Sequence, residues 1–205
     1  MTLGLNIVIV AATVIVSLMA FNNHDLFDKL KFNAWLIKNK KESWRFFSYA
    51  LIHAGFLHLF INMYVLYSFG KIVEQSFLQM FGLRGVLFYA LLYIGGIAFS
   101  TLFDFRKHKN DPYYNAVGAS GAVSAIVFSS ILFFPGGGIY IFPIPFAIPA
   151  WAFAIIYLVY SAYMGRRGGD NIGHNAHFWG AVFGIIFTIA VVPGILEHFY
   201  NQLIN

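Results

Sequence analysis

The sequence predicts an all-α membrane protein, a compact bundle of six transmembrane helices that forms a single domain over residues 1–205. Of its residues, 60% are hydrophobic and only 10% are charged, and the mean hydropathy is +0.71. Soluble domains carry about 25% charged residues, and a soluble chain of about 200 residues buries only about 70% of its surface. In addition, the apolar residues occur in segments near the length of a bilayer span, separated by polar loops.

The composition also excludes several classes of function. The chain has no cysteine, so it has neither a disulfide framework nor a thiolate metal site. Its net charge of +5 is spread over loops, with the densest run at Lys38, Lys40 and Lys41. Such charge suits lipid headgroups better than nucleic acid. We therefore expect the lipid bilayer as a partner, and no nucleic acid, metal or cofactor.

A transmembrane helix needs about 20 mainly apolar residues. The first apolar segment lacks a basic start and a small-residue cleavage site, so we expect a retained span rather than a signal peptide. The loops between segments hold nearly all the charges. The predicted spans of this multi-pass protein are residues 3–21, 55–71, 85–103, 119–134, 146–164 and 176–192.

Two segments depart from the usual span length. Trp44–Phe69 would form a helix of about 39 Å, against about 30 Å of hydrocarbon. We expect Gly55 to divide it, leaving residues 44–54 in the membrane interface, where Trp44 and a snorkelling Arg45 fit. The fourth segment is short, about 22 Å, if its helix begins near Ser120. A recess that holds water is expected above that helix start.

Polar and ionisable side chains inside spans are rare and mark functional sites. Here they are His58, Asn62, Ser120 and His177, with His53 near a helix end. The second, fourth and sixth spans all enter from the same membrane face. These side chains are therefore expected to meet at one depth, near one end of the bundle.

Ser120 lies in the run Gly118-Ala119-Ser120-Gly121. One interpretation is a nucleophile at a helix start, where glycines permit a tight turn and free N–H groups stabilise an oxyanion. The other interpretation is close helix packing by small residues.

His177 precedes a pair of glycines, Gly180 and Gly184, whose spacing lets another helix approach closely. If that neighbour is the fourth span, His177 Nε2 reaches Ser120 Oγ and acts as a general base. A plain interhelical hydrogen bond is the alternative.

His58 and Asn62 share one helical face, and both can donate hydrogen bonds to an oxyanion. A structural polar pair is the alternative. Asp104, Asp111 and Asp170 are expected in loops, so a Ser–His dyad is predicted rather than a triad. His174 and His177 have a spacing that could hold a metal ion, but we expect no carboxylate or third histidine nearby to complete a site, and therefore no metal site.

Taken together, these motifs resemble the rhomboid family of intramembrane serine proteases, of the bacterial type with a six-span core. The match covers nearly the whole chain. It rests on the six-span layout and on four motifs in family order: Glu42-x-Trp44-Arg45, His53-x4-His58-x3-Asn62, Gly118-x-Ser120-Gly121 and Ala176-His177-x2-Gly180-x3-Gly184.

The resemblance implies a role for each matched residue. Ser120 would be the nucleophile and His177 the general base and later the acid, while His58, Asn62 and the Ser120 backbone N–H would form the oxyanion hole. Trp44 and Arg45 would belong to an interfacial first loop. The remaining matched residues would support the site: His53, Gly118, Gly121, Gly180 and Gly184.

The resemblance also implies the substrate and the place. Family members cleave transmembrane segments of other membrane proteins near one end. They favour small residues at the cut and helix-destabilising residues beyond it. The bacterial type implies the inner (plasma) membrane.

Two features depart from the family pattern. Many members have a tyrosine four residues after the serine, stacked on the histidine, and here that position is Ser124. We therefore expect another residue, on the fifth span, to orient His177. All lysines and arginines except Lys71 and Arg84 lie in loops after the first, third and fifth segments, which the positive-inside rule would place in the cytoplasm. Family topology places those loops outside, and we follow it because the first loop is membrane-embedded.

Two other functions fit parts of the sequence. A rhomboid-like pseudoprotease would bind membrane clients without cleavage, but such relatives usually lack the serine or the histidine. A small transporter or channel would have polar residues along the whole thickness of several spans. Here these residues gather near one end.

Overall fold

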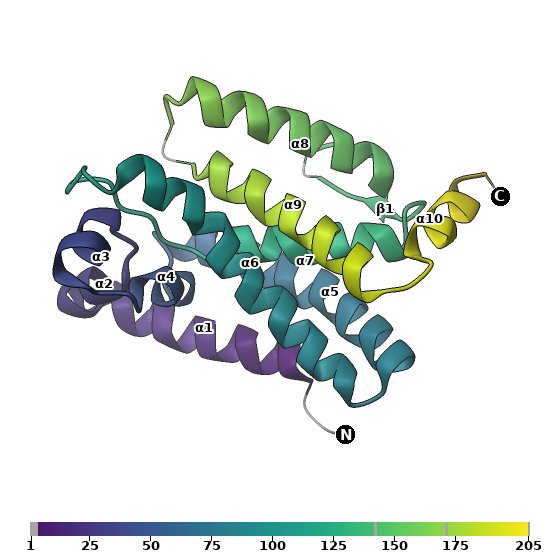
Figure 1. Cartoon of the computed structure of the whole chain (residues 1–205), viewed down its shortest axis with the longest axis horizontal. Coiled ribbons are helices and arrows are strands. Elements are labelled where there is room, and N and C mark those ends of the chain that lie inside the picture. Colours follow the sequence, from purple (N-terminus) through teal and green to yellow (C-terminus); the bar gives the residue numbers. More distant parts are fainter. Residues whose placement is uncertain (1–3, 142, 171, 205) are drawn as a thin grey trace.

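The computed structural model describes residues 4–141, 143–170 and 172–204, and most of this chain is helical (Figure 1). Long helices lie roughly alongside one another, and short helices of the first loop gather at one end of the bundle. The helices are α1 (Leu5–Phe21), α2 (His24–Leu30), α3 (Ala34–Lys40), α4 (Arg45–Ser48), η1 (Tyr49–Leu51), α5 (Phe56–Phe81), α6 (Arg84–His108), α7 (Ser120–Phe133), α8 (Ala150–Arg167), α9 (His174–Val191) and α10 (Ile195–Ile204).

Among the described residues, three helices, α5, α6 and α9, are long and apolar enough to cross a membrane. Helices α1 and α7 are apolar but shorter, and α8 ends in Arg166 and Arg167. The outer face of α5 exposes large apolar side chains such as Phe56, Leu57 and Phe60. An exposed apolar face of this kind is expected where lipid replaces water.

Several boundaries differ from the predicted ones. Helix α5 continues to Phe81 instead of ending at residue 71, so the charged residues Lys71 and Glu74 lie within the helix. Lys71 is exposed, whereas buried Glu74 accepts hydrogen bonds from the backbone N–H groups of Leu5 and Asn6 at the start of α1. The first turn of α1 has no intrahelical acceptors for these N–H groups, so the carboxylate caps it.

The expectation of a purely helical chain is wrong in one detail. A small antiparallel pair joins β1 (Gly138–Ile139) to β2 (Ile148–Pro149). As a result, α8 begins at Ala150, after Pro149, rather than at residue 146. Proline has no backbone N–H and fits the position before a first helical turn.

The break predicted at Gly55 is present. Gly55 is extended, with φ 175°, and α5 starts at the next residue. The preceding residues form α4 and η1, which lie outside the long helix. The first loop also contains α2 and α3, which the hydropathy pattern did not reveal because neither is an apolar segment.

Helix α7 is the centre of the fold. Every residue from Gly121 to Phe133 is buried, and the helix contacts α5, α6 and α9. A Cβ atom on Gly180 would collide with the Gly121 carbonyl, and one on Gly184 would collide with Ala125. The predicted small-residue face of α9 therefore packs directly on the backbone of α7, and the first turns of the two helices come together.

Because α9 packs so closely on α7, adding one methyl group at Gly184 is expected to reduce the stability of the protein markedly. Gly184→Ala would force α9 away from Ala125 and is expected to lower the free energy of unfolding by about 2 kcal/mol. Thermal unfolding in detergent measures it. The matched control is Gly136→Ala, because no heavy atom lies within 4 Å of the position of its Cβ. Equal melting temperatures for the two variants would contradict the packing argument.

Candidate functional site

Ser120 is the first residue of α7, and the chain reaches it through a tight turn. Gly118 has φ +109°, a conformation that residues with a side chain rarely adopt, and Ala119 follows with φ −75° and ψ 1°. The Ser120 backbone N–H belongs to the first helical turn and has no acceptor among the described residues. It is therefore available to an anionic oxygen.

His177 lies in the first turn of α9, next to Ser120. Its Nε2 is 2.8 Å from Ser120 Oγ, and both side chains are half-buried. For the serine hydroxyl to donate this bond, Nε2 must carry the lone pair and Nδ1 the proton. The structure therefore brings the predicted pair within hydrogen-bond distance, with α7 as the neighbour of the Gly180–Gly184 face.

No carboxylate extends this pair among the described residues, where the His177 ring makes no hydrogen bond other than that to Ser120. Asp170 Oδ2 instead lies 3.0 Å from Nε2 of buried His174, and this hydrogen bond lowers the pKa of Asp170. The expected loop position of Asp104 is wrong, because α6 extends to His108 and contains it. Asp104 is buried and accepts a hydrogen bond from Tyr114.

His58 and Asn62 lie in the first two turns of α5. The Asn62 side-chain amide donates to the His58 carbonyl at 3.0 Å, so both are on one face, as predicted. The His58 ring lies against the turn before Ser120, since a methyl group on Gly118 would be 2.7 Å from His58 Cε1. The structure thus places the histidine beside the serine turn and the asparagine one turn deeper on the same helix.

His53, which the family resemblance implied as a supporting residue, contacts the serine turn through hydrogen bonds that the sequence did not indicate. It is fully buried. Its Nε2 accepts from the Ala119 N–H at 3.4 Å, and its Nδ1 is 3.0 Å from Ser17 Oγ, which donates to the Leu51 carbonyl. Burial, aided by His58, lowers the pKa of His53 to about 3. The neutral ring therefore links α1 to the start of α7, and no local motif indicates partners so distant in sequence.

Arg45 is buried rather than snorkelling toward the headgroups. Its Nη1 donates to the carbonyls of Asp28 and Lys31, each at 2.7 Å, and its Nε pairs with Glu42. The loop's own acceptors satisfy the guanidinium, so it stays inside. Trp44 is 48% exposed and donates to the Lys29 carbonyl at 3.3 Å, as an interfacial tryptophan can.

Ser124 lies one turn after Ser120 and contacts a residue of α8. The Tyr157 hydroxyl is 2.7 Å from Ser124 Oγ. The Tyr157 and His177 rings are 6.3 Å apart at an interplanar angle of 28°. A ring from the fifth predicted span is therefore present beside the histidine.

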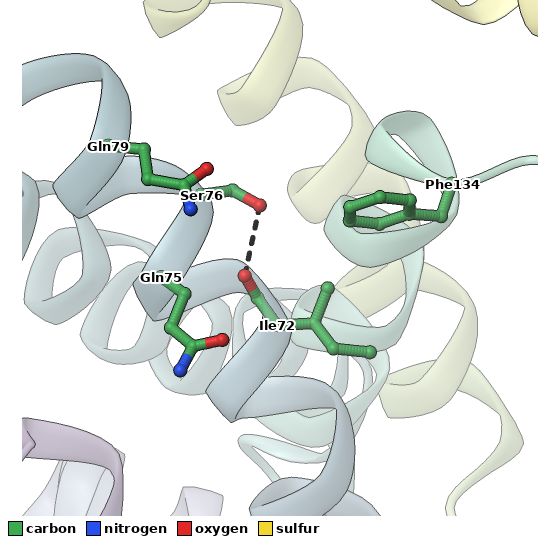
Figure 2. A pocket seen from close by; sticks show the side chains of 5 residues that line it. All are labelled: Ile72, Gln75, Ser76, Gln79 and Phe134. Atoms are coloured by element: carbon green, nitrogen blue, oxygen red, sulfur yellow. Dashed lines mark hydrogen bonds between the residues drawn. The ribbon is translucent and has the colours of Figure 1, made fainter.

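Figure 2 shows a pocket that contains none of the residues of this cluster. It lies where Phe134 follows the end of α7, about 20 Å along the helix from Ser120. Apart from Phe134, its lining comes from α5: Ile72, Gln75, Ser76 and Gln79. No lining side chain titrates, and Ser76 Oγ donates to the Ile72 carbonyl at 3.0 Å. Within the described residues, no group of three or more His, Cys, Asp or Glu could hold a metal ion.

The sequence matches the family model of the rhomboid domain over residues 40–194, a range that contains every predicted site residue. It is 26% identical to rhomboid-related protein 1 of Caenorhabditis elegans over 176 residues, which cover 82% of this chain and 45% of that protein. It is 34% identical to mouse rhomboid-related protein 2 over 90 residues, which cover 44% of this chain and 26% of that protein. The chain thus aligns with less than half of either relative, and neither name specifies an activity.

The buried His53 predicts a pH effect on stability. Its pKa is lower in the folded state than the unfolded value of about 6.5, so its stabilising contribution is complete above that pH and declines as the pH falls toward 3. The amide of His53→Gln can replace both hydrogen bonds but cannot titrate. The melting temperature of this variant is therefore expected to fall less than that of the wild type between pH 7 and 5.

The control for this measurement is His24→Gln, since His24 is exposed on α2. The wild type and His53→Gln differ at this one histidine, so the difference between their pH dependences reports on His53. An unchanged pH dependence in His53→Gln would show that its burial does not contribute to acid destabilisation.

Proposed function

The chain belongs to the rhomboid family, and on this premise we propose that it is an intramembrane serine endopeptidase that cleaves transmembrane segments of other membrane proteins. The observation that carries the proposal is the 2.8 Å contact between Ser120 Oγ and His177 Nε2 at the start of a buried helix. A serine within hydrogen-bond distance of a neutral histidine is the arrangement that activates a weak nucleophile.

The chemistry assigns one task to each group. Ser120 Oγ attacks the carbonyl carbon of the scissile peptide bond while His177 Nε2 accepts its proton. The negative charge that develops on the carbonyl oxygen is stabilised by the Ser120 N–H, His58 and Asn62. His177 then donates the proton to the leaving amine, and a water molecule, deprotonated by the same histidine, releases the acyl group.

The proposed membrane arrangement has six spans, formed by α1, α5, α6, α7, α8 and α9. The starts of α5, α7 and α9 carry His58, Ser120 and His177. Peptide hydrolysis needs water, so the site belongs near the membrane surface on the side of these helix starts. A location with this side outside a bacterial inner membrane remains a prediction; both relatives named above come from animals.

Labelling with a fluorophosphonate tests the activated serine. The Oγ of an activated serine forms a bond with the phosphorus of the probe, and fluoride leaves. Wild-type protein in detergent is expected to be labelled, Ser120→Ala to give no labelling, and His177→Ala to react at least about 100-fold more slowly, because a positioned general base contributes 10²–10⁴-fold.

The matched controls are Ser76→Ala and His24→Ala, which lie outside the cluster and are expected to be labelled at the wild-type rate. Well-folded wild-type protein that is not labelled would contradict the protease proposal and favour a pseudoprotease that binds membrane clients. Labelling that survives in Ser120→Ala would assign the reactive serine to another position.

The oxyanion role of Asn62 gives a second test. Asn62→Ala is expected to reduce cleavage of a transmembrane substrate in proteoliposomes by about 100-fold, because removing one oxyanion donor costs about 10²–10³ in rate. Asn22→Ala, at the exposed end of α1, serves as the control. If Asn62→Ala cleaves at the control rate, the side chain serves only its hydrogen bond to His58.

A further inference from the structure

The hydrogen bond to Ser120 is the single hydrogen bond that the His177 ring makes among the described residues. The Asp170 carboxylate contacts His174 instead. An imidazole with a single hydrogen bond can still rotate about its side-chain bonds. Its orientation toward Ser120 must therefore come from the rings packed around it.

Tyr157 of α8 is placed to provide that packing. Its ring is nearly parallel to the imidazole, at 28°, with the centroids 6.3 Å apart. Offset-parallel pairs are favourable at centroid separations of 4.5–7 Å. The His174 ring also contacts the imidazole, at an interplanar angle of 77° and a centroid distance of 6.1 Å. The two rings together limit the rotation of the imidazole. Of the two, the Tyr157 ring is the one stacked on it.

Tyr157 is itself fixed at both ends. Its hydroxyl is 2.7 Å from Ser124 Oγ, whose own proton goes to the Ser120 carbonyl at 2.9 Å, so the tyrosine is the donor. Its ring contacts Phe128 of α7 and Phe153 of α8 at centroid distances of 5.5 and 5.4 Å. A side chain of α8 is thus anchored to the helix turn that begins with the nucleophile.

We propose that Tyr157, anchored by Ser124, is a positioning residue that holds the His177 imidazole in line with Ser120 Oγ. The inference rests on the proposed function, since it concerns the efficiency of the same pair. The tyrosine touches no reacting atom. Its ring limits rotation of the imidazole, and its hydroxyl sets where the ring lies.

The test measures fluorophosphonate labelling at several probe concentrations, which separates the rate at saturating probe from the half-saturating concentration. Tyr157→Leu is expected to lower the saturating rate by about 10- to 100-fold, because small misplacements of a reacting group cost up to about 100-fold. The half-saturating concentration is expected to stay within about twofold, since binding is not affected. Tyr157→Phe retains the ring and is expected to restore the rate to within about threefold of wild type, the worth of one net hydrogen bond.

Tyr163→Leu is the matched control on the same helix, because Tyr163 is 58% exposed, and its rate is expected to be unchanged. A wild-type saturating rate in Tyr157→Leu would overturn the inference. So would equal losses in the Leu and Phe variants, or a change confined to the half-saturating concentration. Absence of labelling in the wild type would instead overturn the proposed function.

If thermal unfolding shows that Tyr157→Leu does not fold, a second variant tests the same inference. Ser124→Ala removes the anchor and leaves both rings in place, and it is expected to lower the saturating rate by about two- to fivefold. In the Tyr157→Phe background the same change is expected to add no further loss, because the bond is already absent. Additive losses would show that Ser124 acts independently of Tyr157.

Discussion

The close approach of α7 and α9 is the contact on which the rest of the structure depends. Gly180 and Gly184 lie against the backbone of Gly121 and Ala125, so no side chain separates the two helices at these points. In lipid, helices associate through such packing rather than through the hydrophobic effect. Because Gly121 directly follows Ser120 on α7, and Gly180 lies one turn after His177 on α9, the contact brings the Ser120 hydroxyl and the His177 ring to one place. The same glycines that hold the bundle together thus set the geometry of the site.

Polar groups inside an apolar bundle impose a second constraint, because each needs a partner. His53 links Ser17 on α1 to the Ala119 N–H, and Glu74 caps the first turn of α1. Arg45 is surrounded by loop carbonyls. These bonds join segments that are separated in sequence, and the bond from His53 reaches the turn that carries Ser120. A neutral His53 is essential to this role, since a charged ring cannot accept the Ala119 N–H.

Local rules were enough to predict the helix segments, the break at Gly55, the start of α7 at Ser120 and the Gly180–Gly184 face. Each depends on hydropathy, glycine or spacing within a few residues. The Ser120–His177 contact was predicted on the condition that the fourth segment packs on the Gly180–Gly184 face, and α7 does pack there. What failed depends on distant partners. Hydropathy ended the second span at the charged Lys71, and the first-loop helices α2 and α3 have no apolar pattern. The burial of Arg45 and the role of His53 depend on carbonyl, hydroxyl and amide groups that only the fold brings near.

Helix α8 combines weak attachment with a contribution to the site. Only Ala150 and Ser161 of this helix are buried, and in Figure 1 it lies on the outer side of α9. Yet its Tyr157 bonds to Ser124, one turn after Ser120. A displacement of α8 large enough to break that bond would also withdraw the ring that faces His177. Any opening of the bundle along α8 would then leave the histidine less ordered until the helix returned. The proposed Ser120–His177 dyad would be most reactive with the bundle closed, which would link the position of an outer helix to the proposed chemistry.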